Sequence, residues 1–379
     1  MEKRKKVIIT TSVAAIIAAA VFLVIMVVII KGINIATIGQ EEAVSYPMKS
    51  LSNICAYEGK VYCGTGGFYG EPIVQKSNIF AISDNKVYYV EKIQEAYESL
   101  TDELLPIWCS NLDGSNAKVI AEDDFLAGAG HERLIGDKLF YGYQYNEDYN
   151  MQYAYIDLNT GEREEVKTEN RIDNILGYDG TYLYYNGYDG KTESNILGRI
   201  DLKKGKEKVL ASYAQTDEEG YIDNVQFKDG DFYCFTLKEK SESYDYRDYE
   251  YEIQIRDGKT GKVTDTLPYC FTGSANYSML VQEKEVYVAR ADAIVSVPIN
   301  GKEGENTTDS ENLSDSQMKE IVHMKEDEYW GILYFIPGDG YLYYEAIAEV
   351  DEVTGMNDYF YRVPLEGEAA ELLAAWYTA

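Results

Sequence analysis

The chain has 379 residues, 65 acidic and 35 basic, and its formal net charge is −30 at pH 7. A surface this acidic repels phosphate backbones, so nucleic acid is not an expected partner. The only histidines are His131 and His323, which argues against His-based metal sites and His-dependent catalytic triads. The 5 cysteines are too sparse for a disulfide framework.

The N-terminal segment has the pattern of a membrane anchor. Residues 1–6 are rich in lysine and arginine, and the run from Val7 to Ile30 is uncharged and apolar. As a helix this run is about 36 Å long, enough to cross a ~30 Å hydrocarbon core. It exceeds the usual apolar core of a signal peptide, and no A-x-A site follows, so we favour an uncleaved anchor over a cleaved signal.

The basic stub places the N-terminus in the cytoplasm, because cytoplasmic flanks of membrane spans are enriched in Lys and Arg. We therefore predict a single-pass protein of the cell membrane. Its parts are a cytoplasmic stub (1–6), a transmembrane signal anchor (7–30), a linker (31–50) and an extracytoplasmic domain (51–379).

One short phrase, a polar turn followed by an aromatic strand, recurs along residues 51–379. Most of these turns contain Asp-Gly, Gly-Asp or a similar pair that tolerates the positive φ of tight hairpins. Seven copies centre on Val61-Tyr62-Cys63, Val87-Tyr88-Tyr89, Leu139-Phe140-Tyr141, Leu183-Tyr184-Tyr185, Phe232-Tyr233-Cys234, Val286-Tyr287-Val288 and Leu342-Tyr343-Tyr344.

Six copies continue into a third strand and a second polar turn, as in Ala154-Tyr155-Ile156-Asp157-Leu158-Asn159-Thr160-Gly161, and a short fourth strand follows. Four antiparallel strands in about 45 residues match one blade of a β-propeller. We predict an all-β fold, a propeller of six or seven four-stranded antiparallel blades, preceded by one transmembrane helix. The first unit, residues 51–77, lacks the second turn and is either a seventh blade or a hairpin that helps to close the ring.

Large side chains occupy both faces of the middle strands, with Tyr182 and Tyr184 on one face and Leu183 and Tyr185 on the other. Strands buried on both sides have this pattern, so packing between blades accounts for many of the 36 tyrosines.

Cys55 and Cys63 flank the Glu58-Gly59-Lys60 turn, and with a three-residue loop they would be directly opposed across a hairpin. Cross-strand Cβ geometry is often unfavourable for a disulfide, so the sequence leaves this bridge open.

The chain resembles bacterial cell-surface propeller domains of unknown function, and more remotely the YWTD propellers of lipoprotein receptors. The resemblance rests on Tyr-Leu-Tyr-Tyr at 182–185 and 341–344, on Arg199-Ile200-Asp201-Leu202 and on Asn111-Leu112-Asp113-Gly114. The Tyr-Trp-Thr-Asp tetrad itself is absent. The resemblance implies a propeller over roughly residues 50–379 and transfers no catalytic residue.

Long acidic, tyrosine-bearing loops join the second and third strands of several predicted blades, all at one face. Loops on a rigid scaffold commonly carry function, and tyrosine beside carboxylate stacks on sugar rings or receives basic side chains. The alternative is that these loops are solvated connectors. The candidate ligand-binding residues are Tyr97, Glu98, Tyr145, Asp148, Tyr149, Tyr244, Asp245, Tyr246, Asp248, Glu349 and Asp351.

The acidic segment from Gly301 to Glu328 is poor in aromatic residues, which predicts a flexible insertion between blades, with a short helix over Asp315–Met324. Gly190-Lys191-Thr192 and Gly258-Lys259-Thr260 lack the upstream glycine of a P-loop. Carboxylates are abundant, but no Asp-x-Asp-x-Asp-Gly calcium loop is present. We expect no metal site and no cofactor.

The function predicted from the sequence is a membrane-anchored extracytoplasmic module that binds a protein, peptide or glycan without catalysis. The alternative is a carbohydrate-active enzyme that uses a carboxylate pair on the propeller face. The sequence nominates no catalytic residue.

Overall fold

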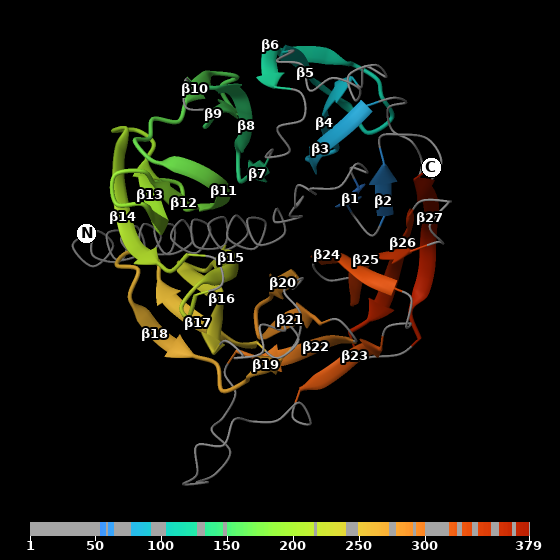
Figure 1. The fold of residues 1–379 in the computed structure, drawn as a ribbon. Coiled ribbons are helices and arrows are strands. Elements are labelled where there is room, and N and C mark those ends of the chain that lie inside the picture. The colour runs from blue at the N-terminus through green and yellow to red at the C-terminus, as the bar shows by residue number, and fades with distance from the viewer. Residues whose placement is uncertain are drawn as a thin grey trace, which may run out of the picture. The chain divides into compact units, whose positions relative to one another are not determined.

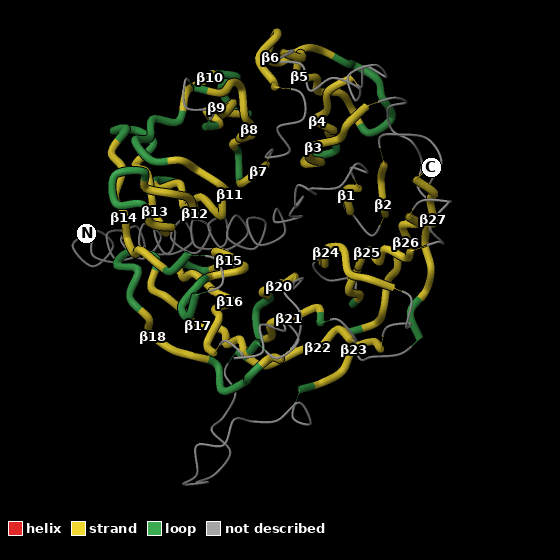
Figure 2. Tube along the Cα trace, viewed as in Figure 1, coloured by secondary structure: helices red, strands yellow, loops and turns green. Residues whose placement is uncertain are grey.

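The computed structural model describes residues 54–57, 60–63, 77–91, 104–126, 133–146, 150–215, 218–239, 249–272, 278–290, 293–299, 318–323, 328–335, 340–349, 356–365 and 369–378. The chain divides into two compact units, Met1–Ala43 and Val44–Ala379, and all described residues belong to the second. They form strands and loops (Figure 2). Among them no helix is long and apolar enough to cross a membrane. The predicted anchor, Val7 to Ile30, lies outside the described residues.

The strands form antiparallel sheets built from consecutive stretches of chain (Figure 1). The first sheet has two strands, β1 (Ile54–Tyr57) and β2 (Lys60–Cys63). The other sheets each have four strands in chain order, and the sheet that begins with β15 also has the short β19 (Phe271–Thr272) paired to β17.

The bounds of these sheets are as follows: β3 (Ser77–Ser83), β4 (Lys86–Glu91), β5 (Leu104–Asn111) and β6 (Lys118–Leu126); β7 (Arg133–Ile135), β8 (Lys138–Tyr145), β9 (Met151–Asp157) and β10 (Arg163–Glu165); β11 (Arg171–Tyr178), β12 (Tyr182–Asp189), β13 (Ser194–Asp201) and β14 (Lys206–Tyr213); β15 (Ile222–Lys228), β16 (Asp231–Glu239), β17 (Glu250–Asp257) and β18 (Val263–Thr266); β20 (Ser278–Val281), β21 (Glu285–Ala289), β22 (Ala293–Pro298) and β23 (Lys319–His323); β24 (Glu328–Phe335), β25 (Tyr341–Glu349), β26 (Met356–Pro364) and β27 (Glu371–Thr378).

Successive sheets touch through their first strands. β1 contacts β3, and further contacts run from β3 to β7, β7 to β11, β11 to β15, β15 to β20 and β20 to β24. Four-stranded sheets whose first strands neighbour one another are the arrangement of a β-propeller, in which each sheet is a blade. The predicted all-β propeller fold is confirmed in this respect.

The middle strands are buried from both sides. In β12, Leu183 and Tyr185 are 0% exposed and pack against Phe140 of the preceding sheet. Tyr184 faces the other way and stacks on Phe227 of the following sheet, with ring centroids 3.8 Å apart. The strand lies between two neighbouring sheets, so both of its faces are buried. This explains why Tyr-Leu-Tyr-Tyr does not alternate polar with apolar residues.

The hairpin turns use the residues that the sequence analysis singled out. Asp84 and Asn85 between β3 and β4 have φ of 49° and 57°, and Gly180 between β11 and β12 has φ of 89°. Backbone in this left-handed region suits Gly, Asn and Asp. The repeated Asp-Gly, Gly-Asp and Asp-Asn pairs therefore mark the first turn of most sheets correctly, while the β20–β21 turn has Glu283-Lys284 instead.

Three details differ from the sequence-based predictions. The β1–β2 turn has two residues rather than three, so Cys55 pairs with Tyr62 and Cys63 with Ile54. The two cysteines are therefore not cross-strand partners in this register. The prediction of a helix over 315–324 is wrong for 319–323, which form β23. The predicted insertion, 301–328, therefore includes a strand, and its first part joins two strands of one sheet, β22 and β23.

Candidate functional site

A basic groove lies on the outer part of the sheet formed by β11 to β14. It has a volume of about 330 Å³ and is open to solvent, at the small end of the range of ligand sites. Its lining residues come from the start of β12, the end of β13, the turn after it and β14: Tyr182, Arg199, Asp201, Lys204, Lys206, Glu207 and Lys208. We call this set the basic groove.

Strand register decides which of these side chains share a face. Arg199 pairs with Tyr184 on one side and with Lys208 on the other, and Asp201 pairs with Tyr182 and Lys206. Directly paired residues project to the same face of an antiparallel sheet. Arg199, Lys206 and Lys208 therefore gather on the face that looks toward the β15–β18 sheet.

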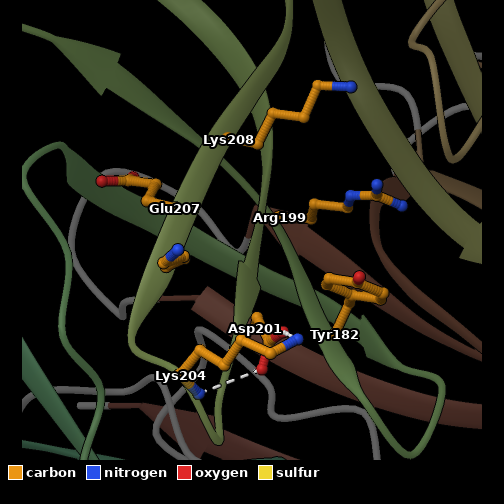
Figure 3. A pocket seen from close by; sticks show the side chains of 7 residues that line it. Tyr182, Arg199, Asp201, Lys204, Glu207 and Lys208 are labelled. Carbon is orange, nitrogen blue, oxygen red and sulfur yellow. Dashed lines mark hydrogen bonds and ion pairs between the residues drawn. The ribbon is translucent and has the colours of Figure 1, made fainter.

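The guanidinium of Arg199 is held by two tyrosines. It lies over the ring of Tyr182, 4.2 Å from the centroid (Figure 3), a cation–π contact that fixes its plane. It also contacts the hydroxyl of Tyr184, which donates a hydrogen bond of 2.8 Å to Asp179. Burial and the bond to Asp179 raise the pKa of Tyr184 to about 12, and the nearby Arg199 moderates that rise.

Asp201 and Lys204 are already paired within the turn that follows β13. The Nζ of Lys204 lies 2.9 Å from Asp201, as the dashed line in Figure 3 marks. This hydrogen bond is the main reason that the pKa of Asp201 is lowered and that of Lys204 is raised. The Asp201 carboxylate also accepts a bond from the Lys204 backbone N–H, which tightens the turn.

Glu207 points away from the other groove side chains (Figure 3). It pairs with Ile200 and so projects to the opposite face. There it accepts hydrogen bonds from Tyr185 and from the segment before β11, including 2.9 Å from the Thr168 hydroxyl and 2.7 Å from the Glu169 N–H. Glu207 thus holds the sheet to the preceding linker and does not neutralise the cations of the groove.

The three remaining cations of the groove have no carboxylate partner among the residues that the structure describes. No ion pair involves Arg199, Lys206 or Lys208 there, and Lys208 makes only a 3.4 Å contact to the backbone oxygen of Lys259. Arg199 and Lys208 lie directly opposite each other, an arrangement of like charges that disfavours the sheet. An anion placed between them would relieve this repulsion.

The loop residues predicted as a binding rim fall largely outside the described part of the chain. Tyr145, at the end of β8, is described and is 46% exposed. Glu349 ends β25. The rim remains a prediction for the rest, which lie outside the described residues: Tyr97, Glu98, Asp148, Tyr149, Tyr244, Asp245, Tyr246, Asp248 and Asp351.

The basic groove was not among the sites predicted from the sequence, although the lysines that line it are adjacent there. The run Lys203-Lys204-Gly205-Lys206-Glu207-Lys208 is locally basic in a chain of net charge −30. It was used only as a turn of the repeat. Arg199 and Lys208 share a face because they pair across β13 and β14. The lysine-rich run alone does not reveal that pairing.

Within the described ranges, no group of three or more His, Cys, Asp or Glu side chains is placed to hold a metal ion. The carboxylates of Asp201 and Glu207 project to opposite faces of one sheet, so these two do not form the pair that glycoside hydrolysis requires.

Comparison with known proteins gives no family. No protein-family model matches the sequence, and no curated protein matches it. Solved structures with a similar fold include the β-propeller domain of the Trilobed protease from Pyrococcus furiosus, at 14% identity and a TM-score of 0.49 over 79% of this chain and 86% of that one.

Two further similar structures belong to enzymes. A prolyl endopeptidase matches at 11% identity and a TM-score of 0.46 over 79% of this chain and 50% of its own. An oligogalacturonate lyase solved with manganese matches at 16% identity and a TM-score of 0.42 over 64% of this chain and 63% of its own. The chain thus spans half to two-thirds of their lengths, and at these scores the propeller assignment rests on the sheets and contacts above.

These neighbours contradict the prediction of a non-catalytic binding module. That prediction took a propeller without recognisable catalytic residues as evidence against catalysis. Propeller folds of this kind occur in a prolyl endopeptidase and an oligogalacturonate lyase, so the fold does not support that exclusion. A fold hosts many functions, and the identities are too low to carry either enzyme's activity to this chain.

Proposed function

We propose that this chain recognises a ligand through an anionic group bound in the basic groove. The observation that carries the proposal is the gathering of Arg199, Lys206 and Lys208 on one sheet face without a carboxylate partner among the described residues. Guanidinium and ammonium groups bind carboxylate, phosphate and sulfate by charge-assisted hydrogen bonds. Such recognition serves a substrate as well as a docking partner.

The rest of the chain limits what this ligand is. At a net charge of −30 the molecule repels long polyanions beyond contact range. The groove therefore suits a ligand with one or a few anionic groups rather than an extended nucleic acid. Its openness toward solvent predicts that binding weakens as salt is added.

The test compares the 379-residue chain with an Arg199→Gln, Lys206→Gln, Lys208→Gln variant by titration calorimetry. The probes are inorganic phosphate, a uronate oligosaccharide and a glutamate-containing peptide, and each mixture is also analysed for products. We expect the wild type to bind at least one probe and the variant to lose about tenfold or more in affinity. Equal affinity of both chains for every probe would refute the proposal. The Lys118→Gln, Lys203→Gln, Lys262→Gln variant, which removes three exposed cations outside the groove, controls for loss of positive charge.

We also propose, from the sequence, that Val7 to Ile30 anchors the chain in the cell membrane with residues 51–379 outside. The supporting observation is the uncharged run behind a basic stub. Protease added to intact cells should then remove the C-terminal domain. Protection of that domain in intact cells, with digestion only after lysis, would contradict this topology. A cell-surface protein, peptide or glycan is the partner that this location favours.

For the blade count, we propose seven positions around the propeller, with β1 and β2 as an incomplete blade. The contact of β1 with β3 repeats the contacts between the first strands of the other sheets, which supports a blade-like position for the two-stranded sheet.

A further inference from the structure

The sheet β24–β27 repeats the tyrosine–arginine part of the basic groove, but a carboxylate stands opposite its arginine where the groove has a lysine. Tyr341, Tyr343 and Arg362 occupy the positions of Tyr182, Tyr184 and Arg199, within the same Tyr-Leu-Tyr-Tyr phrase. The guanidinium of Arg362 lies 4.7 Å from the Tyr341 ring centroid and contacts the Tyr343 hydroxyl, as Arg199 does with its two tyrosines.

The outermost strands also correspond position by position. Arg199 pairs with Lys208, and Arg362 pairs with Glu371. Both registers shift by one bulge immediately beyond these pairs, between Leu197 and Gly198 in one sheet and between Phe360 and Tyr361 in the other. Lys208 and Glu371 are therefore structurally equivalent.

In β24–β27 the arginine is neutralised within the chain. The Nε and Nη2 atoms of Arg362 donate to one oxygen of Glu371 at 2.7 and 2.6 Å. This bond is the main reason that the pKa of Arg362 is raised. In β11–β14 the equivalent position carries a second cation, so the same tyrosine-held guanidinium faces a lysine instead of a carboxylate.

We infer that the anionic group bound in the basic groove is a carboxylate of an acidic peptide segment, which takes the place beside Arg199 that Glu371 takes beside Arg362. This inference rests on the proposed function and names the ligand for it. A glutamate side chain already satisfies the equivalent tyrosine–arginine pair, so carboxylate geometry fits. Lys206 and Lys208, two positions apart on one strand face, lie about 6.6–6.8 Å apart along the strand. That spacing matches acidic residues at alternate positions of an extended peptide.

The test gives Lys208 the acidic residue type found at the equivalent position in β27. Lys208→Glu should supply the internal carboxylate, which pairs with Arg199 and excludes the ligand. We expect its affinity for a blocked peptide with glutamates at alternate positions to fall about tenfold or more below that of the wild type. Its Tm should rise by about 1–2 °C, since a like-charge contact becomes an ion pair. Lys208→Gln should reduce the affinity for the peptide by a smaller factor and leave Tm unchanged.

Lys262→Glu is the matched control, because it makes the same charge change at an exposed side chain outside the groove. It should leave Tm unchanged and reduce affinity by less than about threefold, as expected of a screened charge. The same peptide with glutamine in place of glutamate should not bind the wild type.

The outcomes separate this inference from the proposed function. If the wild type binds none of the anionic probes, both fail. If it binds phosphate or the uronate oligosaccharide through the groove but not the peptide, the proposed function stands and the peptide carboxylate is refuted. If it binds the peptide but Lys208→Glu behaves like Lys208→Gln in affinity and Tm, the equivalence with Glu371 is refuted.

Discussion

Lys138, the first residue of β8, is a nearly buried cation that Asp157 holds closely and Asp137 holds at a longer distance, 3.8 Å. Its side chain is 11% exposed, and its Nζ lies 2.7 Å from Asp157. Burial by itself lowers the pKa of Lys138, but the bond to Asp157 and the nearby Asp137 outweigh it, so the pKa is raised. The rings of Tyr155 and Tyr178 lie 5.2 and 5.7 Å from the ammonium and support it further.

Asp157→Ala should lower the free energy of unfolding by about 2 kcal/mol. The change leaves a largely buried ammonium with only the more distant Asp137. That remaining contact and the partial exposure of the pair keep the cost below the ~3–5 kcal/mol of a fully buried pair. Urea unfolding followed by circular dichroism measures it. Lys138→Met should cost less, because it removes the charge that needs the partner. A larger loss for Lys138→Met than for Asp157→Ala would contradict this account.

The same pair predicts a pH dependence. The bond from Lys138 is the main reason that the pKa of Asp157 is lowered in the folded chain. The unfolded chain therefore binds the proton first as pH falls, which favours unfolding. The Lys138–Asp157 bond contributes fully to the stability of the fold at pH values above the pKa of Asp157 in the unfolded chain, about 3.9. As pH falls below that value and through the lower pKa of Asp157 in the folded chain, this contribution is lost. Between pH 5 and pH 2, as rough limits, wild type should lose more stability than Asp157→Asn. If the free energy of unfolding fell equally with pH in both chains, the proposed role of the Lys138–Asp157 bond would be contradicted.

At the scale of elements, one turn recurs between third and fourth strands. Asp157, Asp201 and Asp257 each end a third strand, and the glycine four residues later donates its N–H to the aspartate carbonyl at 2.7 to 2.8 Å. Each carboxylate also accepts backbone N–H groups of its own turn. The glycines Gly161, Gly205 and Gly261 have φ of 74°, 59° and 72°, the left-handed region.

Gly161 and Gly261 should differ in their tolerance of a side chain. A Cβ on Gly161 meets nothing within 4 Å, whereas one on Gly261 meets the Leu210 carbonyl oxygen at 2.5 Å. Gly161→Ala should therefore cost only the left-handed backbone penalty, about 1–2 kcal/mol. Gly261→Ala should cost more, because β14 must also move. Thermal unfolding of both variants checks this, and equal losses would show that the contact between turn and strand is not tight.

Much of this element structure was predictable from the sequence, and the reasons for the failures are physical. Asp-Gly pairs and aromatic runs located the turns and middle strands, since positive φ and two-sided burial restrict residue choice locally. The register at Cys55 and Cys63 was misjudged because it depends on turn length by a single residue. The strand β23 was read as part of a helix because an isolated short strand acquires its pairing from β22, far away in sequence.

At the scale of the whole molecule, specific polar contacts tie one sheet to the next. Gln226 of β15 donates to the carbonyl of Met279 and accepts the N–H of Val281 at 2.8 Å, both in β20. Val281 is 2% exposed, so water does not readily replace this partner. One side chain thus completes backbone hydrogen bonds between the first strands of neighbouring sheets.

Gln226→Met should lower the free energy of unfolding by about 1–3 kcal/mol, because a buried N–H and a carbonyl lose their partner. Gln152→Met is the control. The Gln152 side chain bonds only to nearby backbone, at 3.3 and 3.4 Å. Gln152→Met should therefore change the free energy of unfolding by no more than about 0.5 kcal/mol. Chemical denaturation of both chains measures the difference. A neutral Gln226→Met would show that packing alone joins these sheets.

The propeller could be predicted from the repeat, but the basic groove could not. The period and composition of the phrase report packing between blades, which every copy shares. The groove depends on a lysine, Lys208, at the position where another sheet has Glu371. These two residues can be matched only when the strand registers and bulges of both sheets are known. The expectation of a non-catalytic module failed for a related reason, since a shared scaffold does not determine the chemistry of its surface.

The central claim is that the basic groove binds a carboxylate of an acidic peptide segment beside Arg199. The most direct measurement is a crystal structure of the 379-residue chain with the glutamate-containing peptide bound. The account predicts a peptide carboxylate beside the Arg199 guanidinium, between it and Lys208, with Tyr182 still beneath the guanidinium. A peptide bound elsewhere on the molecule, with the groove cations facing only solvent, would contradict it.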